Sequence, residues 1–201
     1  MLKRFRAYWT QLLTPLAKLF LRMGVSPDAV TLVGTIGVVT GALAFFPRGE
    51  LLTGVLVITA FVFSDLLDGT MARLANTSSR FGAFLDSTLD RLGDAAIFGG
   101  LVLYFAGPGE SPTLTALALY CLVMGSVTSY ARARAGSLGM EAEGGLAERA
   151  DRLVAILVMT ALSDVFDLPV LIPVTLAVLA AASTITVVQR ILAVRRQAAA
   201  R

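Results

Sequence analysis

Residues 65–90 read DLLDGTMARLANTSSRFGAFLDSTLD, and this stretch decides the fold. An apolar run leads into it from residue 51, and another leads out of it to residue 106. The segment between the runs, at residues 76–80, is rich in the Asn, Thr and Ser that favour turns. Since about 20 apolar residues in a helix cross a bilayer core, the stretch predicts two antiparallel helices that share one end at the membrane surface.

The composition agrees with a membrane protein along the whole chain. Of its 201 residues, 56% are hydrophobic and only 15% are charged, which is more apolar content than a soluble domain of this length buries. Apolar runs of spanning length recur at residues 27–46, 51–75, 81–106, 113–135, 149–166 and 169–195. We therefore expect an all-α integral membrane protein, a single domain over residues 1–201 with a six-helix bundle at residues 27–195.

The first 24 residues form a different kind of segment, because basic side chains share them with an apolar stripe at helical spacing that includes Trp9, Leu13 and Leu16. This pattern predicts an amphipathic helix at residues 1–24 that lies in the membrane interface. A cleavable signal peptide is the alternative. Pro15 and Lys18 interrupt the apolar core that a signal peptide needs, and no small-residue cleavage site follows.

The distribution of basic residues predicts the orientation in the membrane. Cytoplasmic loops and helix ends accumulate Lys and Arg. With six spans, Arg48 is the only one of the 17 basic residues to fall in the opposite half. We therefore expect a multi-pass protein of the cell membrane whose termini, and whose turn at residues 76–80, face the cytoplasm.

The rare residues restrict the chemistry. The chain has no histidine, so the commonest general base and transition-metal ligand is missing. Its one cysteine, Cys121, has no partner for an intrachain disulfide or a CxxC site. Any acid, base or metal chemistry must therefore fall to carboxylates.

Four carboxylates lie at the shared cytoplasmic end of the second and third expected spans: Asp65, Asp68, Asp86 and Asp90. The spacings i, i+3 and i, i+4 put each pair on one face of its helix. Charge inside a membrane is costly and is functional by default. Four such groups in one pocket would raise one another's pKa unless cations neutralise them, and an all-oxygen site favours two Mg²⁺ ions, with Mn²⁺ as the alternative.

Two other interpretations of these aspartates stay open. They could form buried ion pairs with Arg73, Arg80 or Arg91, or they could belong to an ion-coupled transporter. Transporters usually carry internal repeats and broken helices, and the sequence shows no repeat. Gly69 and Ala72 leave a bare strip beside Asp68, and Arg73 adds a guanidinium suited to phosphate, which favours a phosphorylated substrate.

The pattern D-x2-D-G-x2-A-R-x8-G-x3-D-x3-D is complete from Asp65 to Asp90 and resembles the signature of CDP-alcohol phosphotransferases. Residues 26–31, SPDAVT, also resemble that family's segment before its first span. The resemblance implies that an alcohol hydroxyl attacks the β-phosphorus of CDP-diacylglycerol and releases CMP. It implies metal ligation by all four aspartates, with Asp90 also the general base. The CDP-diacylglycerol contacts that it implies are Asp28, Ala29, Val30, Thr31, Gly69, Ala72, Arg73 and Ser79.

Arginines on the later spans bear on the acceptor alcohol. Arg132, Arg134, Arg152 and Arg190 lie at cytoplasmic helix ends, where arginine groups usually meet an anion. The segments around them resemble those of actinobacterial phosphatidylinositol phosphate synthases. This resemblance implies myo-inositol 1-phosphate as acceptor. We expect Arg132 or Arg134, together with Arg152 and Arg190, to grip its phosphate, with Glu148 and Asp151 as orienting groups. Glycerol 3-phosphate, the acceptor of phosphatidylglycerophosphate synthases, is the alternative. The family also implies a homodimer in contact with membrane lipid, and no nucleic-acid partner is expected.

Overall fold

The computed structural model describes residues 14–62, 64–75 and 79–199, except for the side chains of residues 64–66. All regular structure in these ranges is helical. The helices are α2 (Pro27–Phe45), the 3₁₀ turn η1 (Phe46–Arg48), α3 (Leu51–Val62), α4 (Ser64–Ala75), α5 (Arg80–Ala106), α6 (Pro112–Ser137), α7 (Arg149–Val165) and α8 (Leu171–Ala199). These bounds confirm the expected helices to within a few residues, with α3 and α4 together forming the second one.

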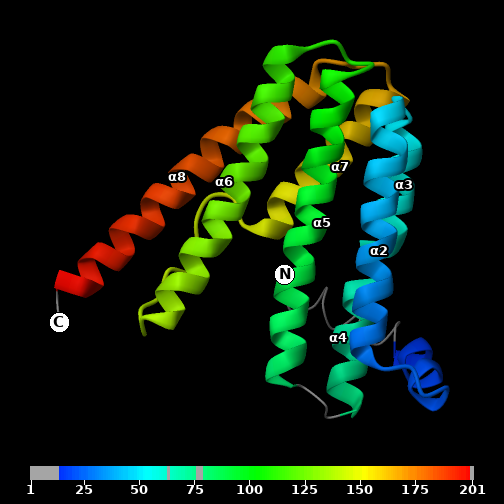
Figure 1. The fold of residues 1–201 in the computed structure, drawn as a ribbon, viewed down its shortest axis with the longest axis vertical. Coiled ribbons are helices and arrows are strands. Elements are labelled where there is room, and N and C mark those ends of the chain that lie inside the picture. Colours follow the sequence, from blue (N-terminus) through cyan, green and yellow to red (C-terminus); the bar gives the residue numbers. More distant parts are fainter. Residues whose placement is uncertain (1–13, 63, 76–78, 200–201) are drawn as a thin grey trace.

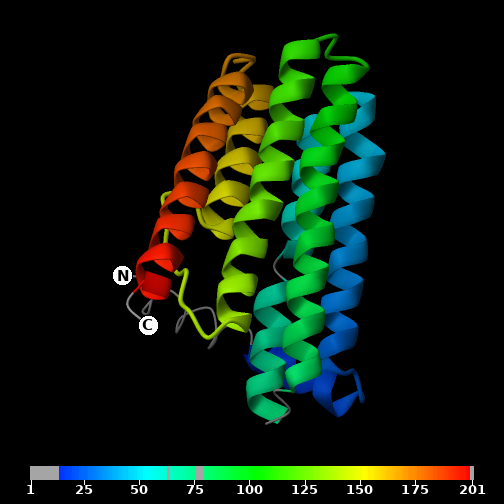
Figure 2. The same cartoon turned by 60° about the vertical axis from the view of Figure 1, so that its left-hand side comes forward.

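The helices form two groups that meet at one end and diverge at the other. In Figure 1, α2, α3, α4 and α5 stand nearly upright, whereas α6 and α8 lean away from them. Within the first group α2 packs against α3, α4 and α5, and in the second α8 packs against α6 and α7. Packing of α5 against α6 and of α3 against α7 connects the two groups. Figure 2 shows the same helices running side by side along the long axis.

Serine and proline explain why several helices begin where they do. Ser26, Ser79 and Ser111 are the N-caps of α2, α5 and α6, and each side chain accepts a hydrogen bond from a backbone N–H of its first turn. A proline follows Ser26 and Ser111 at the first helical position, where no intrahelical donor is lost. The starts of α2, α5 and α6 are therefore fixed locally by the sequence.

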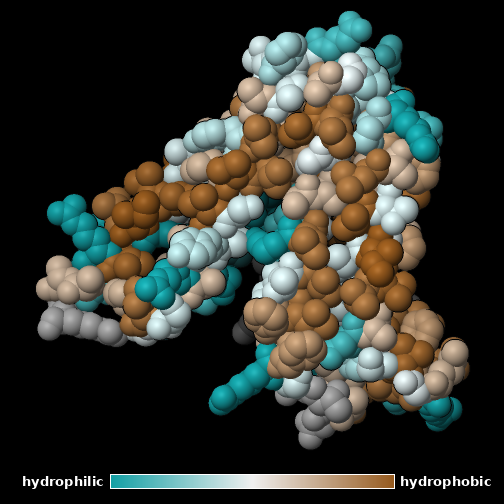
Figure 3. Space-filling view, in the orientation of Figure 1, coloured by the Kyte–Doolittle hydropathy of each residue, from teal (hydrophilic) through white to brown (hydrophobic). Residues whose placement is uncertain are grey.

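In the part of the chain that the structure describes, four helical stretches are long and apolar enough to cross a membrane: Pro27–Arg48, Leu51–Ala75, Pro112–Ser137 and Leu171–Ala199. Two further helices, α5 and α7, do not meet this criterion of length and apolar composition. α5 has 27 residues, but its first half carries Arg80, Asp86, Asp90, Arg91 and Asp94. α7 has only 17 residues. Large apolar side chains are exposed on the outer faces of the helices, as lipid contact requires, and Figure 3 shows brown surface along both groups.

The N-terminal segment is described in part. Residues 14–22 are helical, and Figure 1 shows them in dark blue at an angle to α2. Ala17 is fully buried in a small cluster with Leu67 and Met71 of α4. Residues 1–13 of the predicted interfacial helix lie outside the described residues.

Glycines let the first group pack closely. A Cβ added at Gly100 of α5 would lie 2.9 Å from the carbonyl oxygen of Ala42 in α2 and 3.0 Å from the ring of Phe46. Its neighbour Gly99 faces open space, with no atom within 4 Å of such a Cβ. Of this adjacent pair, therefore, only Gly100 sits at a close helix contact.

We expect Gly100→Ala to destabilise the protein by about 1–3 kcal/mol, because the added methyl group forces α5 away from α2. The matched variant Gly99→Ala should leave stability unchanged or raise it slightly, since a helical glycine is replaced where there is room. The melting temperature of each variant is measured by heating the protein with a thiol dye, which labels the fully buried Cys121 only when the protein unfolds. Equal melting temperatures for the two variants would contradict this assignment of the contact.

Candidate functional site

A cavity of about 460 Å³ opens where α2, α4 and α5 meet at the diverging end of the bundle. Its wall contains seven of the residues predicted from the sequence: Asp28, Thr31, Asp68, Gly69, Ala72, Ser79 and Asp86. They come from three helices and from both sides of the turn at residues 76–80. The fold thus brings most of the motif and the first turns of α2 to one place.

Hydrogen bonds hold two walls of this cavity. The hydroxyl of Thr31 donates to Oδ2 of Asp68 at 2.5 Å, which ties α2 to α4 through a buried pair. Ser79 accepts from the backbone N–H of Gly82 at 2.8 Å and so begins α5 at the rim. A Cβ at Gly82 would lie 3.3 Å from Asp28, so glycine allows the first turn of α5 to approach α2.

Three predicted donor contacts do not line the cavity. Val30 packs instead against the cluster of Ala17, Leu67 and Met71. Ala29 is exposed, and its backbone N–H donates to the Ser26 cap at 3.2 Å. Arg73 is exposed, and its Nη2 donates to the hydroxyl of Thr70 at 3.2 Å.

Asp90 lies one turn further along α5 and faces a different neighbour. Its Oδ1 is 2.9 Å from Nη1 of Arg149, the first residue of α7. A small cavity of about 20 Å³, enough for one water molecule, touches both side chains and Thr35. Asp68 and Asp86 therefore share the large cavity, while Asp90 points toward α7.

The four-aspartate cluster stays a prediction. The side chain of Asp65 lies outside the described residues, although its backbone is in α4. Among the side chains that the structure describes, no group of three or more Asp, Glu, Cys or His lies close enough together to hold a metal ion.

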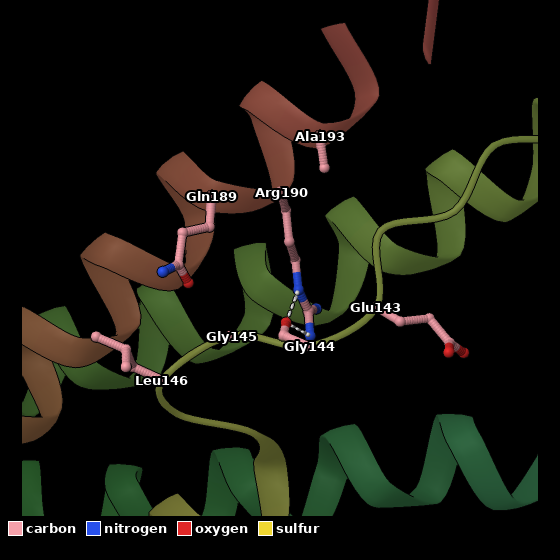
Figure 4. A pocket seen from close by; sticks show the side chains of 7 residues that line it. All are labelled: Glu143, Gly144, Gly145, Leu146, Gln189, Arg190 and Ala193. Carbon is pink, nitrogen blue, oxygen red and sulfur yellow. Dashed lines mark hydrogen bonds between the residues drawn. The ribbon is translucent and has the colours of Figure 1, made fainter. Parts of the chain in front are cut away.

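The four predicted acceptor arginines come from α6, α7 and α8. Arg190 is buried; its Nη1 donates to the carbonyl of Thr128 at 2.5 Å, and its Nε and Nη2 donate to the carbonyl of Gly144 at 3.2 Å. Figure 4 shows Arg190 reaching from α8 to the loop at Gly144, beside a cavity of about 410 Å³. Arg132 and Arg152 both lie within electrostatic reach of Arg190.

The other three arginines make interactions of different strength. Nη2 of Arg132 is 2.8 Å from Oε1 of Glu143, but both side chains are more than half exposed, so this pair contributes little stability. Nη1 of Arg134 donates to the hydroxyl of Ser137 at 3.2 Å. Arg152 is 2% exposed and donates to the carbonyl of Ala147 at 3.0 Å. The expected orienting pair does something else, since Asp151 accepts from the backbone N–H of Glu148 and caps α7.

Sequence reasoning missed the ionic connection between α5 and α7. Arg149 binds Asp90 and Asp94 together, and Arg91 donates to Ser129 of α6. The signal was present, because Asp94 follows Asp90 at i+4 and so lies on the same helix face. Nothing in the sequence alone indicated that the first turn of α7 would meet this face.

The family model of the CDP-alcohol phosphatidyltransferases matches residues 24–143. The chain belongs to this family. The matched segment contains the whole motif and the walls of the 460 Å³ cavity. Family membership decides in favour of an enzyme over the transporter that the sequence left open.

Relatives cover nearly the full chain. A phosphatidylinositol phosphate synthase of Streptomyces avermitilis is 51% identical over 98% of this chain and 83% of its own length. One of Cutibacterium acnes is 53% identical over 98% of both chains. The crystal structure of the Mycobacterium tuberculosis phosphatidylinositol phosphate synthase with CDP-DAG bound is similar, with a TM-score of 0.88, 43% identity and coverage of 92% of this chain and 94% of that one. The protein is accordingly an integral membrane protein.

We expect Gly145→Ala to release the loop beside Arg190 from α8. Gly145 has φ of +136°, and a Cβ there would lie 2.3 Å from the side chain of Thr186. Cleavage after Glu141, Glu143 or Glu148 by a Glu-specific protease should become several-fold faster. Gly136→Ala, where nothing lies within 4 Å, is the matched control. Unchanged cleavage of Gly145→Ala would show that the loop does not depend on this contact.

Proposed function

We propose that this enzyme transfers the phosphatidyl group of CDP-diacylglycerol to a hydroxyl of myo-inositol 1-phosphate, giving phosphatidylinositol phosphate and CMP. The observation that carries the proposal is the placement of seven motif and α2 residues around one cavity. Relatives more than 50% identical over nearly the whole chain are phosphatidylinositol phosphate synthases, and a related structure holds CDP-DAG.

The 460 Å³ cavity takes the cytidine diphosphate part of the donor. Gly69 and Ala72 face it with little or no side chain, and nothing lies within 4 Å of a Cβ added at Gly69. The nucleotide can therefore approach the backbone of α4. Ser79 and Asp28 offer polar groups at the rim. Of the expected donor contacts, Asp28, Thr31, Gly69, Ala72 and Ser79 line the cavity, whereas Ala29, Val30 and Arg73 lie outside its wall.

Divalent metal suits the carboxylates on this wall. Asp68 and Asp86 present hard oxygen donors to the same cavity, and Thr31 fixes one oxygen of Asp68. Asp65 and Asp90 complete the proposed ligand set for two Mg²⁺ ions, with Mn²⁺ as the alternative; a related structure contains manganese. Such ions supply Lewis-acid stabilisation of the charge that develops on the diphosphate.

Asp90 acts as the general base. It accepts the proton of the acceptor hydroxyl while the hydroxyl oxygen attacks the β-phosphorus, and the bond to CMP breaks with its electron pair leaving on CMP. The contact with Arg149 fixes the orientation of the Asp90 carboxylate at the start of α7. The absence of histidine from the chain is consistent with a carboxylate in this role.

The acceptor phosphate binds among Arg132, Arg134, Arg152 and Arg190. Arg190 lines the second cavity, and Arg132 is held beside it by its ion pair with Glu143, so a phosphate dianion there would have guanidinium partners. Figure 3 shows hydrophilic surface at the apex of the notch between the two helix groups. A water-soluble acceptor can reach the helix ends through this notch.

All six long helical stretches span the membrane in this proposal, including α5 and α7. The charged first half of α5 then lies at the cytoplasmic boundary, where its aspartates meet ions and substrates instead of lipid. The distribution of basic residues supports an orientation in which that boundary lies on the cytoplasmic side of the cell membrane.

The acceptor is tested by giving the purified enzyme CDP-diacylglycerol, Mg²⁺ and one alcohol at a time. We expect CMP release with myo-inositol 1-phosphate, and much less with glycerol 3-phosphate, myo-inositol or serine, because only a phosphorylated acceptor engages the arginines. Chelation by EDTA should abolish release. Turnover with glycerol 3-phosphate alone would instead identify a phosphatidylglycerophosphate synthase.

Substitution of the base should act on the chemical step. We expect Asp90→Asn to lower kcat at least about 100-fold, because general bases typically contribute a factor of 100 to 10,000. Steady-state CMP release measures kcat, and the melting temperature checks folding. Asp167→Asn, between α7 and α8 at the other end of the bundle, is the control expected to keep wild-type activity. Full CMP release by Asp90→Asn would rule out the base assignment.

A further inference from the structure

Asp94 is a buried carboxylate on α5 that lies outside the motif. It is 8% exposed and sits one turn beyond Asp90. Three guanidinium groups surround it: Nε of Arg149 at 3.0 Å, Nη2 of Arg91 at 3.5 Å and Nη2 of Arg152 at 3.7 Å. A carboxylate this deeply buried is stable as an anion only with such partners.

These contacts connect Asp90, the proposed general base, to Arg152, a proposed ligand of the acceptor phosphate. Arg149 binds Asp94 through Nε and Asp90 through Nη1, so that one guanidinium bridges two carboxylates a turn apart. Arg152 is one of the proposed acceptor ligands and lies one turn further along α7. Asp94 therefore lies between the proposed general base and the proposed phosphate site.

Arg152 depends on Asp94 for its position. Its guanidinium packs against the bare backbone of Gly125 in α6, where a Cβ would lie 3.4 Å from Nε and Nη2. Nη1 donates to the carbonyl of Ala147. Among the described side chains, Asp94 is the carboxylate that the structure places within ion-pair distance of Arg152. Removing it leaves a buried guanidinium without its anion, which disturbs the arrangement strongly.

We propose that Asp94 is a positioning residue for the acceptor: it holds Arg152, and with Asp90 it holds Arg149, so that the acceptor phosphate is bound with its hydroxyl facing Asp90. The inference rests on the proposed function. It assigns to Asp94 no contact with either substrate. Its effect on the acceptor passes through the guanidinium groups alone.

Neutralising Asp94 changes the net charge of the cluster and also releases Arg152. These two effects predict opposite changes in the affinity for the acceptor phosphate. The cluster has three positive groups, Arg91, Arg149 and Arg152, against the two negative groups Asp90 and Asp94. Asp94→Asn leaves three against one, and long-range attraction alone would then tighten binding of a phosphate dianion. Positioning predicts weaker binding, because Arg152 is no longer held where the phosphate needs it. The sign of the change therefore distinguishes the two effects.

The test compares Asp94→Asn with wild type in two measurements. The first is the dissociation constant for myo-inositol 1-phosphate, measured by calorimetry without donor. The second is the KM for each substrate. We expect acceptor binding to weaken about tenfold, the loss of one well-placed charge-assisted contact, and the KM for CDP-diacylglycerol to change less than twofold. Asp164→Asn is the matched control, since its carboxylate accepts from the backbone N–H of Leu52 at the other end of α7.

Two further variants separate positioning from general damage. Asp94→Glu keeps the negative charge on a longer side chain. Its dissociation constant for the acceptor should lie between those of the wild type and Asp94→Asn. In an Arg152→Gln background, Asp94→Asn should weaken acceptor binding by clearly less than it does in the wild type, because the part of its effect that passes through Arg152 is already lost. If Asp94→Asn does not fold, Asp94→Glu carries the test, and wild-type acceptor affinity in that variant overturns the inference.

Several outcomes would contradict this role. They are tighter acceptor binding in Asp94→Asn, an equal rise in both KM values, and full additivity with Arg152→Gln. Failure of the proposed function is recognised separately. A wild type that binds inositol phosphate but releases no CMP refutes the proposed reaction, whereas a wild type that turns over while Asp94→Asn keeps its acceptor affinity refutes only the inference.

Discussion

A carboxylate within a membrane helix must find a cation or a hydrogen-bond donor, and this constraint organises the diverging end of the bundle. Asp68 meets the hydroxyl of Thr31, which fixes α4 against α2. Asp90 and Asp94 meet Arg149, which fixes α7 against α5. Elements far apart in the sequence are thus held together by the carboxylates of α4 and α5 and their partners on α2 and α7.

The helices themselves could be predicted almost completely from the sequence. Apolar runs of spanning length, separated by Ser, Pro, Gly and Asn, give nearly the same bounds that the structure shows. The prediction is reliable here because a chain in lipid must satisfy its backbone groups internally, which leaves few alternatives to helix. The caps at Ser26, Ser79 and Ser111 are equally local, since each bond forms within a few residues.

The wall of the 460 Å³ cavity could be predicted in part, and the surroundings of the later arginines less so. Fixed spacing within α4 and α5 predicted that Asp68, Gly69 and Asp86 would meet, and they do share one wall. The partners of Arg152 depended on how α7 packs against α5 and α6, which spacing does not determine. Glu148 and Asp151 were nearer in sequence, but they bond to each other at the start of α7, whereas Asp94 of α5 lies within ion-pair distance of Arg152.

The position of the donor cavity at the helix ends has a kinetic consequence. On the proposed function, one substrate diffuses within the plane of the bilayer and the other in the aqueous volume. The concentration that governs donor binding is then its mole fraction among membrane lipids, and adding inert lipid lowers it without changing its molarity. The acceptor obeys ordinary molar concentration. Donor binding therefore depends on the lipid composition of the membrane, whereas acceptor binding depends on the concentration of the acceptor in solution.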